Sequence, residues 1–296
     1  MNETDLLADR FEEHRGRLRA VAYRMLGSTA EAEDAVQETW LKLSRTDVAE
    51  IRNLGAWLTT VTGRVCLDLL RSRTTRREDP LDDTFVPDPV IRPLTRTDPE
   101  EEVLRADSVG LALLVVLETL EPAERLAFVL HDMFAVPFDD IAPIVDRSPA
   151  ATRQLAGRAR RRVQGATPSS EPDPGRRREV LDAFLAASRA GEFEALLAVL
   201  HPDIVLRADS GTLVGAAASK VVRGARAVAE QALLFREFAP HAHLVLINGE
   251  PGFVNIVDGR IQSVMGVTVA DGRITEMYIL ADPERLATLD LPKGIG

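Results

Sequence analysis

Apolar residues recur at helical spacing through the first half of the chain. The pattern predicts amphipathic helices over residues 4–26, 29–45 and 55–73, followed by helices over 100–120 and 120–134. Each helix has one apolar stripe and several polar faces, so none of them is expected to be stable alone. The first half of the chain is therefore predicted to form small helical bundles.

Two short helices joined by a tight turn are predicted between Phe138 and Val163. Asp146-Arg147-Ser148 ends the first helix, and Ser148 and Pro149 suit the N-cap and first position of the second. The residues expected on the buried face of the second helix are Ala151, Leu155, Ala159 and Val163. The arginines on its other faces are Arg153, Arg158, Arg160, Arg161 and Arg162. This pattern is typical of a helix-turn-helix that reads the DNA major groove, and a helical hairpin with a solvated basic end is the alternative.

The second half of the chain has a different pattern. After the Thr167–Gly175 stretch, helices are predicted over 176–190, 193–200 and 224–238, with a weak strand at 204–207. The strands that follow are 242–248, 252–257, 261–270 and 273–281. Asn248-Gly249, Asp258-Gly259 and Asp271-Gly272 separate these runs and are strong hairpin signals. Helices followed by an antiparallel meander indicate an α+β fold.

Breaks in composition divide the chain into five segments. Residues 79–99 are rich in Pro and Asp and are predicted to be an extended linker, and residues 167–175 are predicted to be a hinge. The predicted domains are residues 1–78, 100–166 and 176–296. A length of 296 residues agrees with two or more domains.

Charge and cysteine content narrow the functional classes. The formal net charge is −10, but basic residues cluster at 64–77 and 147–162, so weak DNA binding that needs a partner protein is expected. One cysteine, Cys66, permits no internal disulfide and makes a structural zinc site improbable. The acidic N-terminus is unlike a secretory signal, and no apolar run is long enough for a membrane span. A cytoplasmic protein with no membrane partner is therefore expected.

Two charged helix faces in the first domain are candidates for function. Asp34, Gln37 and Glu38 share an exposed face, which is either a solvated surface or a partner contact. Arg64, Asp68 and Arg71 are spaced i, i+4 and i+7, which places them on one face of the next helix. They form either an ordinary ion pair beside fraying arginines or a nucleic-acid contact.

Four segments together resemble the extracytoplasmic-function sigma factors of bacterial RNA polymerase. They are AEDAVQETWLKL (32–43), WLTTVTGRVCLDLLRSR (57–73), LEPAERLAFVLHDMF (120–134) and the helix-turn-helix, in that family's order and spacing. The resemblance implies that core RNA polymerase and promoter DNA are partners and that no cofactor is needed. It also implies that residues 1–78 open and read the −10 element and that residues 100–163 read the −35 element.

The resemblance assigns roles by position. Residues matching the contact with the polymerase β′ clamp are Asp34, Gln37, Glu38 and Trp40. Residues matching the −10 surface are Arg64, Asp68, Arg71, Arg73 and Arg76. Residues matching the −35 reading helix are Ser148, Ala150, Arg153, Gln154 and Arg158. Many family members have an asparagine where this chain has Arg64, so the −10 preference cannot be copied from them.

The C-terminal segment resembles a SnoaL-like domain of the NTF2-like superfamily, a cone whose sheet wraps around helices. Sigma factors with such a tail carry a proline motif like VPDPV (86–90), a loop like Asp209–Thr212 and a segment like ADPERL (281–286). The resemblance implies an intramolecular contact between this domain and the sigma domains. The residues expected to make it are Asp209, Gly211, Asp282 and Leu286. The expected fold is thus two all-α sigma-factor domains followed by an α+β NTF2-like cone.

Two other functions remain open from the sequence. The tail could be a cyclase or isomerase, or a small-ligand domain without chemistry, fused to a DNA-binding module. The candidate acids and bases are Asp209, His241, His243, Glu250, Tyr278 and Asp282, but none lies in a recognisable catalytic motif, so catalysis is not expected. Alternatively, the chain could be a promoter-binding repressor that never meets polymerase.

Overall fold

The computed structural model describes residues 3–47, 51–76, 84–94, 109–166, 171 and 173–292, apart from the side chains of residues 3–5, 74–76 and 216. Parts of the predicted linker, of the 100–120 helix and of the hinge lie outside the described residues. The chain divides into two compact units. Met1–Pro80 and Val116–Ala166 form a helical unit, and Leu81–Val115 and Thr167–Gly296 form a sheet-containing unit.

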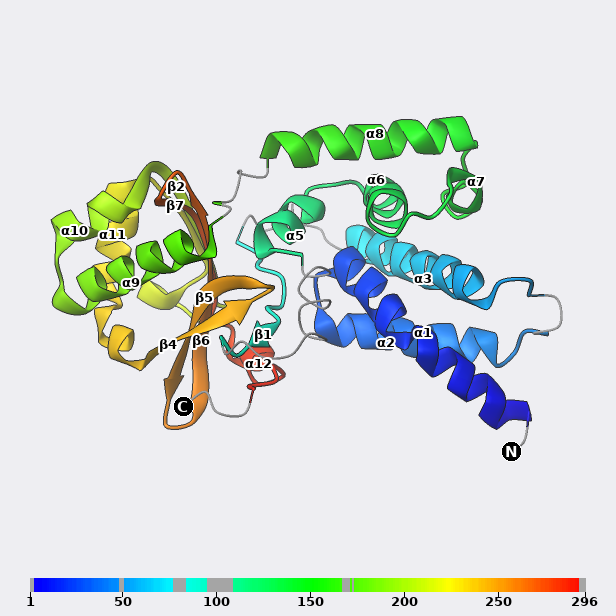
Figure 1. The fold of residues 1–296 in the computed structure, drawn as a ribbon, viewed down its shortest axis with the longest axis horizontal. Coiled ribbons are helices and arrows are strands. Elements are labelled where there is room, and N and C mark those ends of the chain that lie inside the picture. Colours follow the sequence, from blue (N-terminus) through cyan, green and yellow to red (C-terminus); the bar gives the residue numbers. More distant parts are fainter. Residues whose placement is uncertain are drawn as a thin grey trace. The chain divides into compact units, whose positions relative to one another are not determined.

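Three long helices begin the helical unit (Figure 1). They are α1 (Glu3–Leu26), α2 (Thr29–Leu43) and α3 (Leu54–Arg76), within a few residues of the predicted bounds. Their apolar stripes meet in a core that includes Phe11, Leu18, Val36, Leu43 and Leu58, all nearly inaccessible to solvent. Burial of these stripes is what stabilises the bundle.

The predicted 120–134 helix is interrupted in the structure. The α-helix α6 (Pro122–Phe128) continues as a π-helical turn (Val129–Met133), and Ala135 then takes a left-handed conformation with φ 56°. Of the predicted 100–120 helix, residues 109–120 are described, and they contain the helix α5 (Leu111–Glu118), within which the division between the two units falls. The other helices among the described residues of the helical unit are α7 (Phe138–Ile141) and α8 (Pro149–Ala166).

The sheet-containing unit has a seven-stranded sheet among its described residues, in the order β1-β4-β5-β6-β7-β2-β3. Its strands are β1 (Ile91–Arg92), β2 (Leu200–Asp209), β3 (Lys220–Arg223), β4 (Ala242–Ile247), β5 (Glu250–Val257), β6 (Arg260–Ala270) and β7 (Arg273–Leu280). Of the strand pairs in the described part of the chain, only β2–β7 is parallel. The predicted α+β class is confirmed, while β1 and β3 were not predicted.

The three predicted hairpin turns are confirmed by their backbone geometry. Asn248-Gly249, Asp258-Gly259 and Asp271-Gly272 all have positive φ at both positions, between 50° and 81°. Positive φ at both central residues defines a type I′ turn, whose twist matches that of the flanking strands. Each turn is closed by the residue pair next to it. The register of the β4–β5 pair continues unchanged from its turn, whereas the register shifts between Asn255 and Ile256 in the β5–β6 pair and between Thr268 and Val269 in the β6–β7 pair.

Helices cover one face of this sheet (Figure 1). They are α9 (Pro174–Ala190), α10 (Phe193–Val199) and α11 (Ala225–Leu234), and the short α12 (Pro283–Leu286) follows β7. The predicted 224–238 helix ends early, since the chain changes to a 3₁₀ helix at Arg236–His241, which contains Pro240. The core between helices and sheet includes Leu181, Phe184, Leu196, Val228, Leu206, Phe253, Val267 and Met277.

The described part of the linker belongs to the sheet-containing unit. Ile91 and Arg92 pair with Leu246 and Ile247 as an added edge strand. Val86 and Asp88 are 1% and 4% exposed. The sequence predicted an extended linker, and these residues are extended; however, they are bound to the C-terminal domain rather than solvated.

Candidate functional site

The acidic face of α2 is exposed as predicted. Asp34, Gln37 and Glu38 are all exposed, and Glu38 lies 3.1 Å from Lys42 one turn later. Trp40 is half-buried, with its ring packed edge-on against Phe11 at 5.2 Å between centroids. Trp40 therefore anchors α2 to α1, while the other three side chains remain on the surface.

The residues predicted for the −10 surface lie in two environments. Arg64, Asp68 and Arg71 are exposed on α3, with Asp68 and Arg71 4.0 Å apart. Arg73 is half-buried and donates to the backbone oxygen of Leu26, the last residue of α1, at 3.2 Å. The side chain of Arg76 lies outside the described residues.

The same helix α3 packs against the second half of the helical unit. A Cβ added at Gly63 would meet Leu126 and Leu130 of α6 and its π-helical turn at 3.0–3.2 Å. Nη2 of Arg64 is 3.5 Å from the backbone oxygen of Pro143, in the turn before the second helix of the helix-turn-helix. The two predicted DNA-reading regions are therefore in contact in this structure.

The helix-turn-helix has the predicted cap and exposed residues. Oγ of Ser148 accepts from the backbone N–H of Ala151 at 3.2 Å, and Asp146 turns the chain with φ 54°. The five predicted −35 residues, Ser148, Ala150, Arg153, Gln154 and Arg158, are exposed. Of the four residues predicted on its buried face, Ala159 is buried, whereas the other three are half-buried. Thr152 and Ala156, each one residue farther along than Ala151 and Leu155, are buried instead.

Arginines along α8 have different partners. Arg158 and Arg162 both bond to Glu124 of α6, at 2.7 and 3.3 Å, and Arg160 pairs with Asp132. The guanidinium of Arg153 lies 5.2 Å from the ring centroid of Phe138. The arginines in the C-terminal half of α8 thus bind it to α6 and to the π-helical turn after α6. The exposed residues of its first turns lie between Ser148 and Gln154.

A linker-binding site, formed by Asp209, Asn248 and Arg285, holds residues 85–91 on the C-terminal domain. Nε of Arg285 donates to Oδ1 of Asp88 at 2.9 Å and Nη2 donates to the backbone oxygen of Val86 at 2.6 Å. Nη1 donates to Asp209 at 2.7 Å, and that carboxylate also accepts from the backbone N–H of Val86 at 3.2 Å. One guanidinium therefore pairs with two carboxylates that are mostly removed from water.

Asn248 extends this site along the sheet edge. Its backbone N–H donates to the oxygen of Val90 and its Oδ1 accepts from the N–H of Val90, both at 2.9 Å. Its Nδ2 donates to the backbone oxygen of Val109 at 3.0 Å. Leu111 packs so close to Gly266 that a Cβ there would overlap it. The C-terminal domain thus binds the chain both before and after residues 95–108, which lie outside the described part.

The sequence analysis found only part of this site. Asp209 was predicted to dock, and the structure places it against the linker residue Val86. Asp282 caps α12 by accepting from the backbone N–H of Glu284, and Gly211 lies so close to Asp282 that a side chain would overlap it. Leu286 is buried. Asp88 and Arg285 were not singled out, although they lie within the VPDPV and ADPERL motifs that the resemblance indicated.

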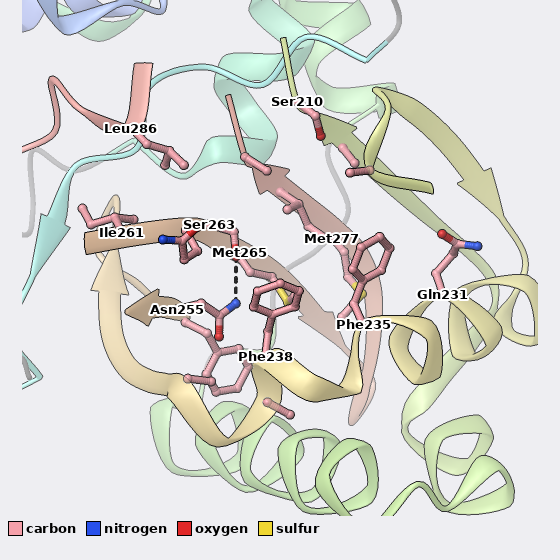
Figure 2. A pocket seen from close by; sticks show the side chains of 18 of the residues that line it. Ser210, Gln231, Phe235, Phe238, Asn255, Ile261, Ser263, Met265, Met277 and Leu286 are labelled. Atoms are coloured by element: carbon pink, nitrogen blue, oxygen red, sulfur yellow. Dashed lines mark hydrogen bonds between the residues drawn. The ribbon is translucent and has the colours of Figure 1, made fainter. Parts of the chain in front are cut away.

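A cavity of about 880 Å³ lies between the helices and the sheet of the C-terminal domain (Figure 2). Its described lining is mainly apolar and includes Phe235, Phe238, Met265 and Met277. None of the six acids and bases considered from the sequence lines it. Tyr278 instead donates to Glu276, and burial together with that carboxylate raises the pKa of Tyr278 far above its usual value. Burial also raises the pKa of Glu276.

The described residues contain neither a cluster of metal-binding side chains nor a reactive cysteine. No group of three or more His, Cys, Asp or Glu side chains there could hold a metal ion. Cys66 is buried in α3, and burial raises the pKa of its thiol to about 12. None of the described helices is both long and apolar enough to cross a membrane.

The chain is similar to known proteins along its whole length. Residues 10–76 match Sigma-70 region 2, and residues 110–163 match Sigma-70, region 4. The ECF RNA polymerase sigma factor SigJ of Mycobacterium tuberculosis (strain ATCC 25618 / H37Rv) is 40% identical over 289 residues, which cover 93% of this chain and 91% of that protein. The probable ECF RNA polymerase sigma factor SigI of the same strain is 34% identical over 299 residues, covering both proteins completely.

A solved structure agrees with these matches. The crystal structure of Mycobacterium tuberculosis SigJ superposes with a TM-score of 0.74 at 37% identity, covering 96% of this chain and all of that one. The expected order of two sigma-factor domains and an α+β cone is thereby confirmed. On these grounds the chain belongs to the family of extracytoplasmic function (ECF) RNA polymerase sigma factors.

Proposed function

We propose that this chain binds core RNA polymerase, directs transcription from specific promoters, and is regulated by its own C-terminal domain. The observation that carries the proposal is the relationship to ECF sigma factors over 93% of the chain, including both sigma regions and the tail. A sigma factor acts where core polymerase is, so the proposed location is the cytoplasm.

The polymerase contact is assigned to the exposed face of α2. Asp34, Gln37 and Glu38 form a surface with two carboxylates that Trp40 holds in place from behind. A rigid helix face with two exposed carboxylates suits a basic partner surface, and we assign it to the β′ clamp. Charge reversal at its centre is therefore expected to weaken binding to core polymerase.

The two promoter contacts are assigned to separate helices. The exposed Arg64, Asp68 and Arg71 of α3 are proposed to face the −10 element. The first turns of α8 are proposed to enter the major groove at the −35 element, where short side chains at Ser148 and Ala150 permit close approach. Arg158, by contrast, is bonded to Glu124, which suits positioning of α8 more than base reading.

Regulation is proposed to act through the linker between the two sigma regions. The −10 and −35 elements are separate sites along DNA, so the helices that read them have to separate, whereas α3 now packs against α6. The C-terminal domain binds linker residues 85–91 through Asp209, Asn248 and Arg285. Because this contact is intramolecular, its high effective concentration allows a modest interface to hold the linker. Release of the linker would lengthen the chain available for separation.

The alternative of an enzyme fused to a DNA-binding module receives less support. General acid–base catalysis requires a titratable group beside the reacting atom. The described lining of the cavity contains no Asp, Glu or His, and its charged side chains are Arg260 and Lys220. Burial lowers the pKa of Lys220, but the lining supplies no carboxylate or imidazole as a second acid or base beside it. A non-catalytic role for the C-terminal domain is part of the proposal.

In vitro transcription with core polymerase tests the proposed function directly. Glu38→Lys should lower promoter-dependent transcript several-fold and weaken co-purification with core polymerase. Glu13→Lys on α1 is the matched control, since Glu13 is equally exposed and undergoes the same charge change. Removal of residues 168–296 should alter transcript yield. Unchanged output from the truncated chain would defeat the regulatory claim, and a full-length chain that selects promoters without core polymerase would defeat the sigma-factor assignment.

A further inference from the structure

The cavity in the C-terminal domain is large enough for a small organic ligand. Its volume of about 880 Å³ falls within the range of ligand pockets, and most of its lining is apolar. Figure 2 shows Leu286 of α12 and Gln231 of α11 on opposite sides of it, with Phe235 and Met277 between them. A ligand that fills this space would therefore contact both a core helix and the short C-terminal helix.

Two lining residues carry polar atoms without a partner. Asn255 is 7% exposed; its Nδ2 donates to Oγ of Ser263 at 2.8 Å, and its Oδ1 has no hydrogen-bond partner. Oε1 of Gln231 is likewise buried without a partner. If the O and N of the Asn255 amide are exchanged, one of its two polar atoms bonds to Ser263 and the other is still buried without a hydrogen-bond partner. A buried unpaired polar atom is costly, so a ligand group that bonds to it gains affinity.

The lining also restricts the chemistry of the ligand. Its described part contains no carboxylate, so a cationic ligand would have no counter-charge there. Of its two cationic side chains, Arg260 is exposed and the ammonium of Lys220 lies 5.5 Å from the ring centroid of Phe235, while most of the other large side chains are aromatic or aliphatic. A hydroxyl group donates to an amide oxygen and also accepts from an amide nitrogen. We propose that the cavity binds a neutral, mainly apolar molecule whose hydroxyl group bonds to Asn255 or Gln231, and that its occupancy is transmitted to the linker.

The transmission step follows from two pairs of neighbouring residues. Arg285 binds the linker, and the next residue, Leu286, lines the cavity. Asp209 binds the linker, and the next residue, Ser210, lines the cavity. A ligand that packs against Leu286 and Ser210 therefore steadies the two segments that hold Val86. This inference rests on the proposed regulatory function, but its test requires neither polymerase nor promoter.

Fluorescence titration of the full-length chain with 2-naphthol and with naphthalene tests the site. The two probes differ only in the hydroxyl group, and 2-naphthol is expected to bind about tenfold more tightly, as one buried hydrogen bond requires. Asn255→Leu and Gln231→Leu should each reduce this preference while retaining naphthalene binding. Ala232→Phe, which fills the cavity from α11, should weaken both probes at least tenfold. Leu234→Phe is its control on the exposed side of the same helix.

Several outcomes would overturn the assignment. Absence of binding by either probe, equal affinities for the two, or unchanged preference in both leucine variants would each refute the proposed hydrogen bond. Two amide variants are used so that misfolding of one, visible by circular dichroism, leaves the other to decide.

Hydrogen exchange tests the transmission step. Saturating 2-naphthol should slow exchange of the Val86 amide at least threefold in the parent chain, because that amide is bonded to Asp209. In Arg285→Ala the probe should still bind but the protection of Val86 should be lost. Binding of 2-naphthol without any change at Val86 would refute the link between cavity and linker, whatever the transcription assays show.

Discussion

Nη1 of Arg285 lies 2.7 Å from Oδ2 of Asp209. Asp209 is the last residue of β2, whereas Arg285 lies in α12, after the last strand β7. Each also binds the linker: Arg285 through Asp88 and the oxygen of Val86, and Asp209 through the N–H of Val86. The C-terminal domain therefore holds the linker through one shared charge network. Loss of Arg285 leaves both carboxylates without this counter-charge.

Arg285→Ala is expected to destabilise the sheet-containing unit by about 3 kcal/mol, the usual cost of removing one partner from a largely buried ion pair. Asp88, which is 4% exposed, would be left with its charge uncompensated by that guanidinium. Urea denaturation measures the effect. Arg226→Ala removes an exposed arginine whose pairing with Glu230 is solvated, so it should cost about 0.5 kcal/mol or less. Equal effects of the two substitutions would show that the linker network contributes nothing to stability.

Local signals in the sequence predicted the local structure well. Asn-Gly and Asp-Gly pairs fix type I′ turns through the φ values they permit, so all three hairpins followed. The register shifts in the β5–β6 and β6–β7 pairs did not. The cap at Ser148 followed because its hydroxyl oxygen can accept from an N–H of the first helical turn. The buried face of α8 was displaced because its residues are small, and small residues give a weak hydrophobic pattern.

Contacts between distant segments could not be predicted in this way. Asp88 and Arg285 are separated by 197 residues, and no periodicity connects them. Asn248 was recognised as a turn residue, yet its amide also binds Val90 in the linker and Val109 just before α5. The apolar residues between Phe85 and Leu94 were too few to predict burial of the linker, because the strand that pairs with them, β4, lies far along the chain.

Arg153→Ala tests which residues of α8 read bases. If Arg153 makes a bidentate base contact, its loss should cost about 1–3 kcal/mol of promoter affinity and relax the preference at one −35 position. Arg161→Ala is the control, since Arg161 is exposed farther along the same helix and is expected to meet phosphate. Its loss should weaken all promoters alike. Affinity of the holoenzyme for a panel of −35 variants distinguishes the two, and a uniform loss with Arg153→Ala would assign that residue to phosphate instead.

Gly63→Leu tests whether packing of the two sigma regions limits activity. A side chain at this position of α3 meets Leu126 and Leu130, so the larger residue should push α3 away from α6. Transcription at limiting amounts of the chain is expected to rise at least about threefold, because the separated state becomes more populated. Gly16→Leu on α1 is the matched control, as nothing lies within 4 Å of the added Cβ. A lower yield from Gly63→Leu at unchanged fold content would show that the contact does not restrain the factor.

Glu276→Gln should change the pH dependence of stability. Burial raises the pKa of Glu276 in the folded chain, whereas in the unfolded chain it is near the ordinary value of about 4.3. The stability contributed by its proton is complete below that unfolded value and is lost as pH rises through the folded pKa. Glutamine has no such proton and can still accept from Tyr278, so the melting temperature of Glu276→Gln relative to the parent should increase from pH 4 to pH 7. Glu230→Gln, on the exposed side of α11, should show no such trend. A constant or decreasing difference would mean that Glu276 is stabilised as the carboxylate by its neighbours.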